Sequence, residues 1–172
     1  MKQEILNKKT PTFHELIKAA SEAKTKEDAI EVFKNAMKED RERITFLLGY
    51  AMNPASKCPL PDGVPPYKVS ESPAGLAPLE LLMLAKKMYP LWDNNVRQAK
   101  REELYIQWME QLCQEEAELF IAIKDQTLHT LYPMLDENTL VSILGWPMEK
   151  YQEMLTKFPR KKAWPRSQLD VQ

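Results

Sequence analysis

Residues 94–135 contain a long stretch of apolar side chains at helical spacing. Large apolar residues recur there at intervals of three and four, as in the series Leu104, Trp108 and Leu112. Because side chains at this spacing lie on one face of a helix, the segment has a wide apolar face that other elements must cover. Around Phe120 the apolar arc widens further, which predicts burial on more than one side. The rest of the chain is therefore expected to pack around this segment, with Trp108 in the core.

Helix start and stop signals divide the whole chain into short helical segments. Thr12 and Thr25 begin capping sequences, Asp136 begins a third, and Gly145 is a natural helix end. A break is expected near Gln114. The predicted helices cover residues 12–23, 25–37, 40–52, 79–89, 94–113, 115–126, 127–135, 139–144 and 148–158. With only 4 glycines, 13 prolines and no β-hairpin signal, the chain is predicted to be all-α, a single orthogonal bundle of about eight or nine helices.

The predicted domain spans residues 1–156 and contains a long Pro-rich connector at residues 54–78, with seven prolines. A loop of this length inside a compact domain is usually either functional or disordered. Two interpretations stay open: a structural connector held against the helices, or a loop that binds a partner. The apolar residues available to hold it are Leu60, Val64, Tyr67 and Leu76.

No pattern of reactive side chains indicates catalysis. His14 and His129 have no His or Cys partner at metal-ligand spacing, and Cys58 and Cys113 are too few for a disulfide framework or the usual thiolate metal site. The acidic clusters are typical of solvated helix faces, and no glycine-rich phosphate loop is present. We therefore expect a protein without catalytic residues, bound metal or cofactor, with two reduced thiols.

Charge and hydropathy restrict the location and the partners. The 24 basic and 25 acidic residues nearly cancel, so the overall charge indicates no polyanionic partner and any nucleic-acid binding needs a local patch. No segment approaches the roughly 20 apolar residues of a membrane helix, and the first residues do not form a signal peptide. The expected location is the cytoplasm, or the host cytoplasm for a viral protein, with no membrane association.

One basic patch lies near the end of the chain, where residues 157–172 form a predicted basic, aromatic tail. Its sequence TKFPRKKAWPR, residues 156–166, contains no acidic residue. Lys and Arg neutralise phosphates, and aromatic rings stack on exposed bases, so the patch predicts contact with DNA or RNA. The candidate nucleic-acid-binding residues are Lys157, Arg160, Lys161, Lys162, Trp164 and Arg166. A protein-binding tail, or a tail whose Trp164 folds back onto the domain, stays open; Trp164 is expected to be at least partly exposed.

The order of helices resembles a known family over roughly residues 5–140. The likeness rests on Ile5-Leu6-Asn7, Thr25-Lys26 before a helix, the Pro-rich connector and the leucine-rich helix after it, Glu118–Asp125, and Tyr132-Pro133-Met134-Leu135. This pattern is similar to the N-terminal α-helical DNA-binding domain of phage-type ATP-dependent DNA ligases. Phe120, Ile121 and Ala122 occupy positions where that family has arginines, and its short Gly-containing loop is missing between Asp125 and His129.

The resemblance implies a helical fold and a connection to DNA, but not ligation. No Lys-x-Asp-Gly nucleotidyltransferase motif follows residue 140, so the chain has no lysine to adenylate. Small free-standing helical proteins of this kind also resemble the accessory proteins of large tailed phages. The leading prediction is a non-catalytic accessory protein that binds nucleic acid. The alternative is a protein–protein interaction adaptor or a host-directed inhibitor of phage origin, which binds a host or phage protein and not DNA.

Overall fold

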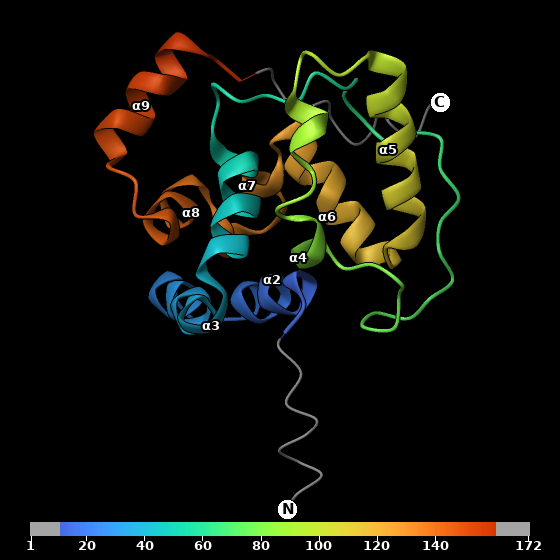
Figure 1. The fold of residues 1–172 in the computed structure, drawn as a ribbon. Coiled ribbons are helices and arrows are strands. Elements are labelled where there is room, and N and C mark those ends of the chain that lie inside the picture. The colour runs from blue at the N-terminus through green and yellow to red at the C-terminus, as the bar shows by residue number, and fades with distance from the viewer. Residues whose placement is uncertain (1–10, 161–172) are drawn as a thin grey trace, which may run out of the picture.

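The protein folds into a bundle of helices, as its computed structural model shows for residues 11–160 (Figure 1). Within this range there are eight α-helices, two 3₁₀ helices and no strand, which confirms the predicted all-α class. The α-helices are α2 (Phe13–Ser21), α3 (Lys26–Met52), α4 (Leu81–Leu84), α5 (Gln98–Gln111), α6 (Gln114–Asp125), α7 (Leu128–Leu131), α8 (Glu137–Leu144) and α9 (Met148–Lys157). The 3₁₀ helices are η1 (Tyr89–Trp92) and η2 (Pro133–Leu135).

Several helix ends are fixed by the predicted local signals. Thr12 and Glu15 form a complete capping box at α2, in which each side chain accepts a hydrogen bond from the other residue's backbone N–H. Asp136 caps α8 by accepting from Thr139, and Gly145 ends that helix with φ of +74°. Lys26, at the start of α3, forms an ion pair with the same Asp136. Local sequence therefore determines where these helices start and stop.

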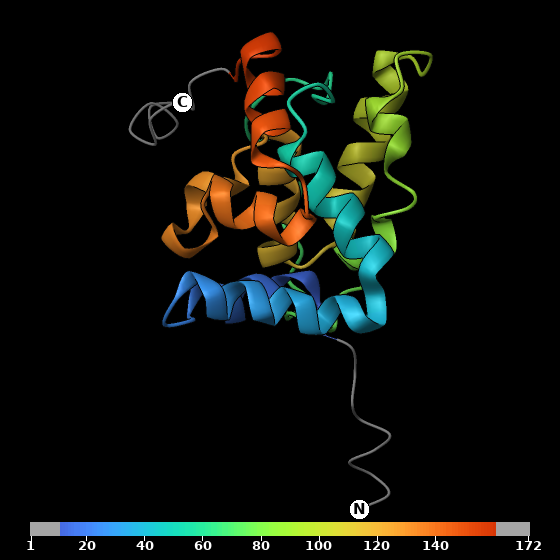
Figure 2. The same ribbon diagram turned by 90° about the vertical axis from the view of Figure 1, so that its left-hand side faces the viewer.

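The second and third predicted helices are joined into α3, which bends sharply at Asp40. This residue has φ of −141° and ψ of +63°, outside the helical region, so the break between the two predicted helices survives as a kink. The first half of α3 lies beside α2 in a layer beneath the other helices (Figure 2). The second half rises from that layer and packs against α6 and α8.

Three predicted helices are shorter than expected, and one of them, 127–135, is divided at the extended residue Tyr132 into α7 and the 3₁₀ helix η2. The predicted helix 79–89 contains only one helical turn, α4, and is followed by η1, because Pro90 disfavours the helical conformation of the residue before it. The predicted start of α5 at residue 94 is also wrong, since Arg97 is the N-cap and Asp93 instead accepts from the N–H of Asn95 in a turn. Arg101 is buried and closes this turn by donating to the carbonyl of Asp93.

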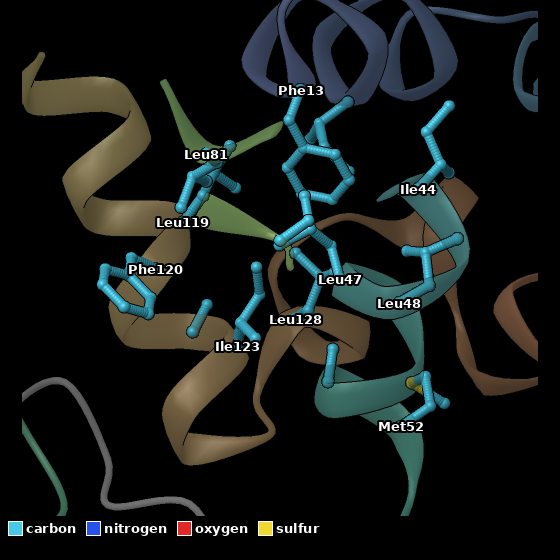
Figure 3. Packing of buried hydrophobic residues seen from close by; sticks show 14 of the residues in the cluster. Phe13, Ile44, Leu47, Leu48, Met52, Leu81, Leu119, Phe120, Ile123 and Leu128 are labelled. Carbon is cyan, nitrogen blue, oxygen red and sulfur yellow. The ribbon is translucent and has the colours of Figure 1, made fainter. Parts of the chain in front are cut away.

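The core forms where α6 meets α2, α4 and the second half of α3 (Figure 3). Leu119, Phe120 and Ile123 of α6 are almost completely buried, as are Phe13 of α2 and Leu47 of α3. The predicted break near Gln114 is confirmed, because α5 ends at Gln111 and α6 begins at Gln114. Trp108, predicted in the core, is only half-buried and packs at the core's margin.

The Pro-rich connector contains no helix or strand, yet part of it is held tightly. Leu60 is buried and Tyr67 packs against the core, as expected for a structural connector. Val64 and Leu76, predicted to do the same, are 67% and 76% exposed. The connector therefore combines buried anchors with apolar side chains that face solvent.

Candidate functional site

Arg160, a predicted nucleic-acid-binding residue, points into the fold. Its Nη1 donates to Oε1 of Gln126 at 2.9 Å, and its Nη2 donates to the carbonyl of Met52 at 2.7 Å and to the hydroxyl of Tyr151 at 2.9 Å. Its Nε lies 3.7 Å from Oε1 of Glu137. With 15% of its side chain exposed, Arg160 fastens the chain after α9 to the C-terminal end of α3. Its guanidinium is therefore occupied by the protein itself.

Lys157 is exposed near the end of α9, three residues before this anchor. The other predicted tail residues, Lys161, Lys162, Trp164 and Arg166, lie outside the described residues. They follow Arg160 directly in sequence, and Arg160 is held by hydrogen bonds to the buried residues Met52, Gln126 and Tyr151.

The charges of the chain are unevenly distributed along the sequence. Residues 11–160 contain 23 acidic and 18 basic side chains, while residues 1–10 and residues 161–172 each contain three basic residues and one acidic residue. A phosphate backbone is repelled by a net acidic surface and attracted by a local basic one. Contact between the helical body and a polyanion is thus restricted to places where cations are locally in excess.

A row of aromatic side chains on α3 and η1 is a second candidate binding surface, located on the helical body. The ring centroids of Phe46 and Tyr50 on α3 are 6.5 Å apart, and those of Tyr50 and Trp92 of η1 are 4.2 Å apart, with interplanar angles of 23° and 26°. Tyr89, at the start of η1, is 62% exposed, and Phe46 is 41% exposed. We call Phe46, Tyr50, Tyr89 and Trp92 the aromatic face.

A shallow hollow of about 270 Å³ adjoins this face. It is lined by Arg41, Glu42, Thr45 and Phe46, all from the second half of α3. Glu42 is paired with Lys86, whose Nζ lies 2.8 Å from the carboxylate. The lining of the hollow is almost entirely apolar, so it suits the flat face of an apolar or aromatic group, with the charge of Arg41 at its edge.

The two cysteines and His129 have pKa values shifted by burial. Burial raises the pKa of the Cys58 thiol to about 11, and burial also raises the pKa of Cys113, so both thiols are protonated at neutral pH. Burial lowers the pKa of His129, and its Nδ1 has no hydrogen-bond partner among the described residues. Across residues 11–160, no group of three or more His, Cys, Asp or Glu residues is placed to hold a metal ion.

Sequence reasoning missed a buried ion pair beneath the connector. Lys124 is 1% exposed, its Nζ lies 2.6 Å from Oδ1 of Asp125, and it donates to the carbonyls of Pro61 and Gly63. The other carboxylate oxygen of Asp125 accepts from the N–H of Gly63 at 3.0 Å. In the sequence these residues look like the polar end of a helix, and no local signal distinguishes them from surface charges. The pair fixes the connector to α6, so its role is structural.

Residues 16–130, about two thirds of the chain, match the model of a family of unknown function (DUF6433). The chain belongs to this family. No curated protein and no solved structure matches the chain. The matched segment includes α3, the connector, η1 and α6, and so covers the aromatic face and the connector anchors of this DUF6433 protein. None of the helices among residues 11–160 has the length and apolar content needed to cross a membrane.

Proposed function

We propose that this protein is a non-catalytic accessory protein that binds nucleic acid, with its basic C-terminal segment contacting phosphates and its helical body serving as the scaffold. The observation that carries the proposal is the anchoring of Arg160 on Met52 and Gln126, immediately before Lys161 and Lys162. The anchor places Arg160, the residue directly before these cations, at the end of α3. Lys157, exposed on α9, adds a cation beside it.

The charge distribution supports the same assignment. Because acidic residues outnumber basic ones in the body, a polyanion is expected to bind at a basic end of the chain and not over the whole surface, and the C-terminal end combines its cations with the aromatic side chain of Trp164. The resemblance to the DNA-binding domain of phage-type ligases also favours DNA, and a place among phage accessory proteins that act in the host cytoplasm. Arg160 is left out of the proposed contacts, which comprise Lys157, Lys161, Lys162, Trp164 and Arg166.

The test compares the full chain with a chain that ends at Arg160, so that the anchor and the fold are retained. Binding to labelled duplex and single-stranded DNA is measured by fluorescence anisotropy at about 50 mM and about 200 mM salt. We expect the full chain to bind more weakly at the higher salt, because phosphate contacts release counterions. We also expect the shortened chain to lose most of its affinity for the duplex. Absence of binding by the full chain to either DNA at low salt contradicts the proposal.

A protein partner is the second candidate function, and the exposed apolar side chains of the connector favour it. Val64, Val69 and Leu76 are 67%, 44% and 76% exposed, and Met83, which follows the connector on α4, is 48% exposed. Exposed apolar residues mark a protein-binding surface where they gather in one patch, so this alternative requires these four side chains to contact a partner together. An apolar interface is weakly sensitive to salt, so salt-independent binding to a protein, with no DNA binding, favours this alternative.

A further inference from the structure

The aromatic face described above is a second place where the body of this protein is suited to nucleic acid, and the inference drawn from it rests on the proposed function. The second half of α3 and residues 86–92 run side by side (Figures 1 and 2). The Lys86–Glu42 ion pair of 2.8 Å joins them at one end, and the stacked rings of Tyr50 and Trp92 join them at the other. Phe46 lies one helical turn from both Glu42 and Tyr50, so it lies between these two junctions.

The rings of this face are partly stacked and partly free. Phe46, Tyr50 and Trp92 follow one another at small interplanar angles, and Phe46 ends the row. The hollow of about 270 Å³ opens beside Phe46, next to Arg41 and Thr45. The hollow thus offers space for a flat group next to the last ring of the row. Tyr89, with 62% of its surface exposed, supplies a further free ring on the neighbouring segment.

The charges around the rings leave cations free for phosphates. Glu42 is paired with Lys86, and Asp40 lies 3.9 Å from the guanidinium of Arg43. Within residues 11–160, the side chains of Arg41 and Lys87 have no ion-pair or hydrogen-bond partner, and both residues are exposed. Arg41 lines the hollow beside Phe46, and Lys87 lies two residues before Tyr89 in the sequence, so two cations without an ion-pair partner adjoin these rings, although acidic residues predominate in the body as a whole.

We propose that the aromatic face binds single-stranded nucleic acid, with bases stacked on Phe46 and Tyr89 and phosphates paired with Arg41 and Lys87. Exposed rings beside cations are the usual means of binding single strands without sequence preference. Bases in a duplex are already stacked on one another, so the face discriminates in favour of single strands. The basic C-terminal segment, in contrast, contacts phosphates in either form.

The test uses substitutions that separate a ring from simple apolar area in the full chain. In the Phe46→Leu/Tyr89→Leu double variant the side chains stay apolar but lose their rings, and we expect about ten-fold weaker binding to a single-stranded oligonucleotide. Duplex affinity is expected to be unchanged. Tyr89→Phe keeps the ring and should bind as tightly as the parent. Leu76→Ala, which removes an exposed apolar side chain from the connector, is the matched control and should bind normally.

The outcomes separate this inference from the proposed function. If the double variant binds single strands as tightly as the parent, the aromatic face is not a base-stacking site, while salt-dependent binding through the C-terminal segment still supports the proposed function. If the double variant loses duplex and single-strand affinity equally, the proposed preference of the aromatic face for single strands over duplexes is contradicted. If the parent binds neither DNA, both proposals fail. Circular dichroism of each variant confirms that the helical fold is retained.

Discussion

The guanidinium of Arg160 donates to the side-chain carbonyl of Gln126 at 2.9 Å, across 34 residues of sequence. Gln126 ends α6 in the left-handed conformation with φ of +57°, and its side-chain amide donates to the carbonyls of Tyr50 and Asn53 at the end of α3. These two residues therefore join the end of the described chain to the ends of two central helices. They satisfy backbone carbonyls that a helix terminus leaves without partners.

Replacement of Arg160 by Ala is expected to lower the free energy of unfolding by about 2–3 kcal/mol, because several hydrogen bonds to a charged donor are lost. Lys157→Ala removes an exposed positive charge three residues earlier and is expected to change stability by no more than about 0.5 kcal/mol. Urea denaturation of both variants measures the difference. Equal stabilities would show that the Arg160 anchor contributes little to the fold.

Gln126 offers a test that separates backbone strain from side-chain hydrogen bonding. Both Gln126→Ala and Gln126→Gly lose the bonds to the carbonyls of Tyr50 and Asn53, and both are expected to be destabilised. Because glycine adopts a positive φ without strain, the Gly variant should retain about 1 kcal/mol more stability than the Ala variant. Thermal or urea unfolding gives the order, and a less stable Gly variant contradicts the structural role assigned to the left-handed backbone.

Lys124→Met tests whether the buried ion pair holds the connector. The substitution leaves the carboxylate of Asp125 without its partner and the carbonyls of Pro61 and Gly63 without their donor. We expect a loss of about 3 kcal/mol in stability and faster proteolytic cleavage within residues 54–78. Lys34→Met, at an exposed position of α3, is the control. Unchanged cleavage kinetics in Lys124→Met would mean that other contacts are sufficient to hold the connector.

The stability of the folded protein is predicted to depend on pH because of His129. Burial and, secondarily, the nearby Arg160 guanidinium lower the pKa of His129 from its ordinary 6.5. Below pH 6.5 the unfolded chain therefore binds a proton at this site more readily than the folded chain, so stability is lost as pH falls from 6.5 toward the lowered pKa. His129→Asn removes this titration, and its stability should decline less than that of the parent between pH 7 and pH 5. Parallel stability curves in urea would contradict the prediction.

The sequence allowed prediction of those features that are set by neighbouring residues. The capping box of Thr12 and Glu15, the Asp136 cap and the Gly145 end were all confirmed, because each needs only residues a few positions apart. The short α4 and the delayed start of α5 were not predicted, because neighbouring turns and prolines outweighed their apolar pattern and apparent cap. The kink at Asp40 was anticipated only as a gap between two helices.

Charged residues were harder to assign than helices. Arg160 and Lys124 look like surface cations in the sequence, but their partners are backbone carbonyls and side chains far away along the chain. The aromatic face also could not be predicted, because it combines residues of α3 with residues of η1, about 40 positions later. Only the fold brings these groups together.

The salt dependence of binding by the full chain to a single-stranded oligonucleotide tests the central proposal most directly. Four cations of the C-terminal segment, Lys157, Lys161, Lys162 and Arg166, together with Arg41 and Lys87, predict that the logarithm of the association constant falls with the logarithm of salt concentration with a slope of about −4. A steep negative slope that becomes shallower in the chain ending at Arg160 is the predicted result. No binding at low salt, or an affinity that does not change with salt, would contradict the account.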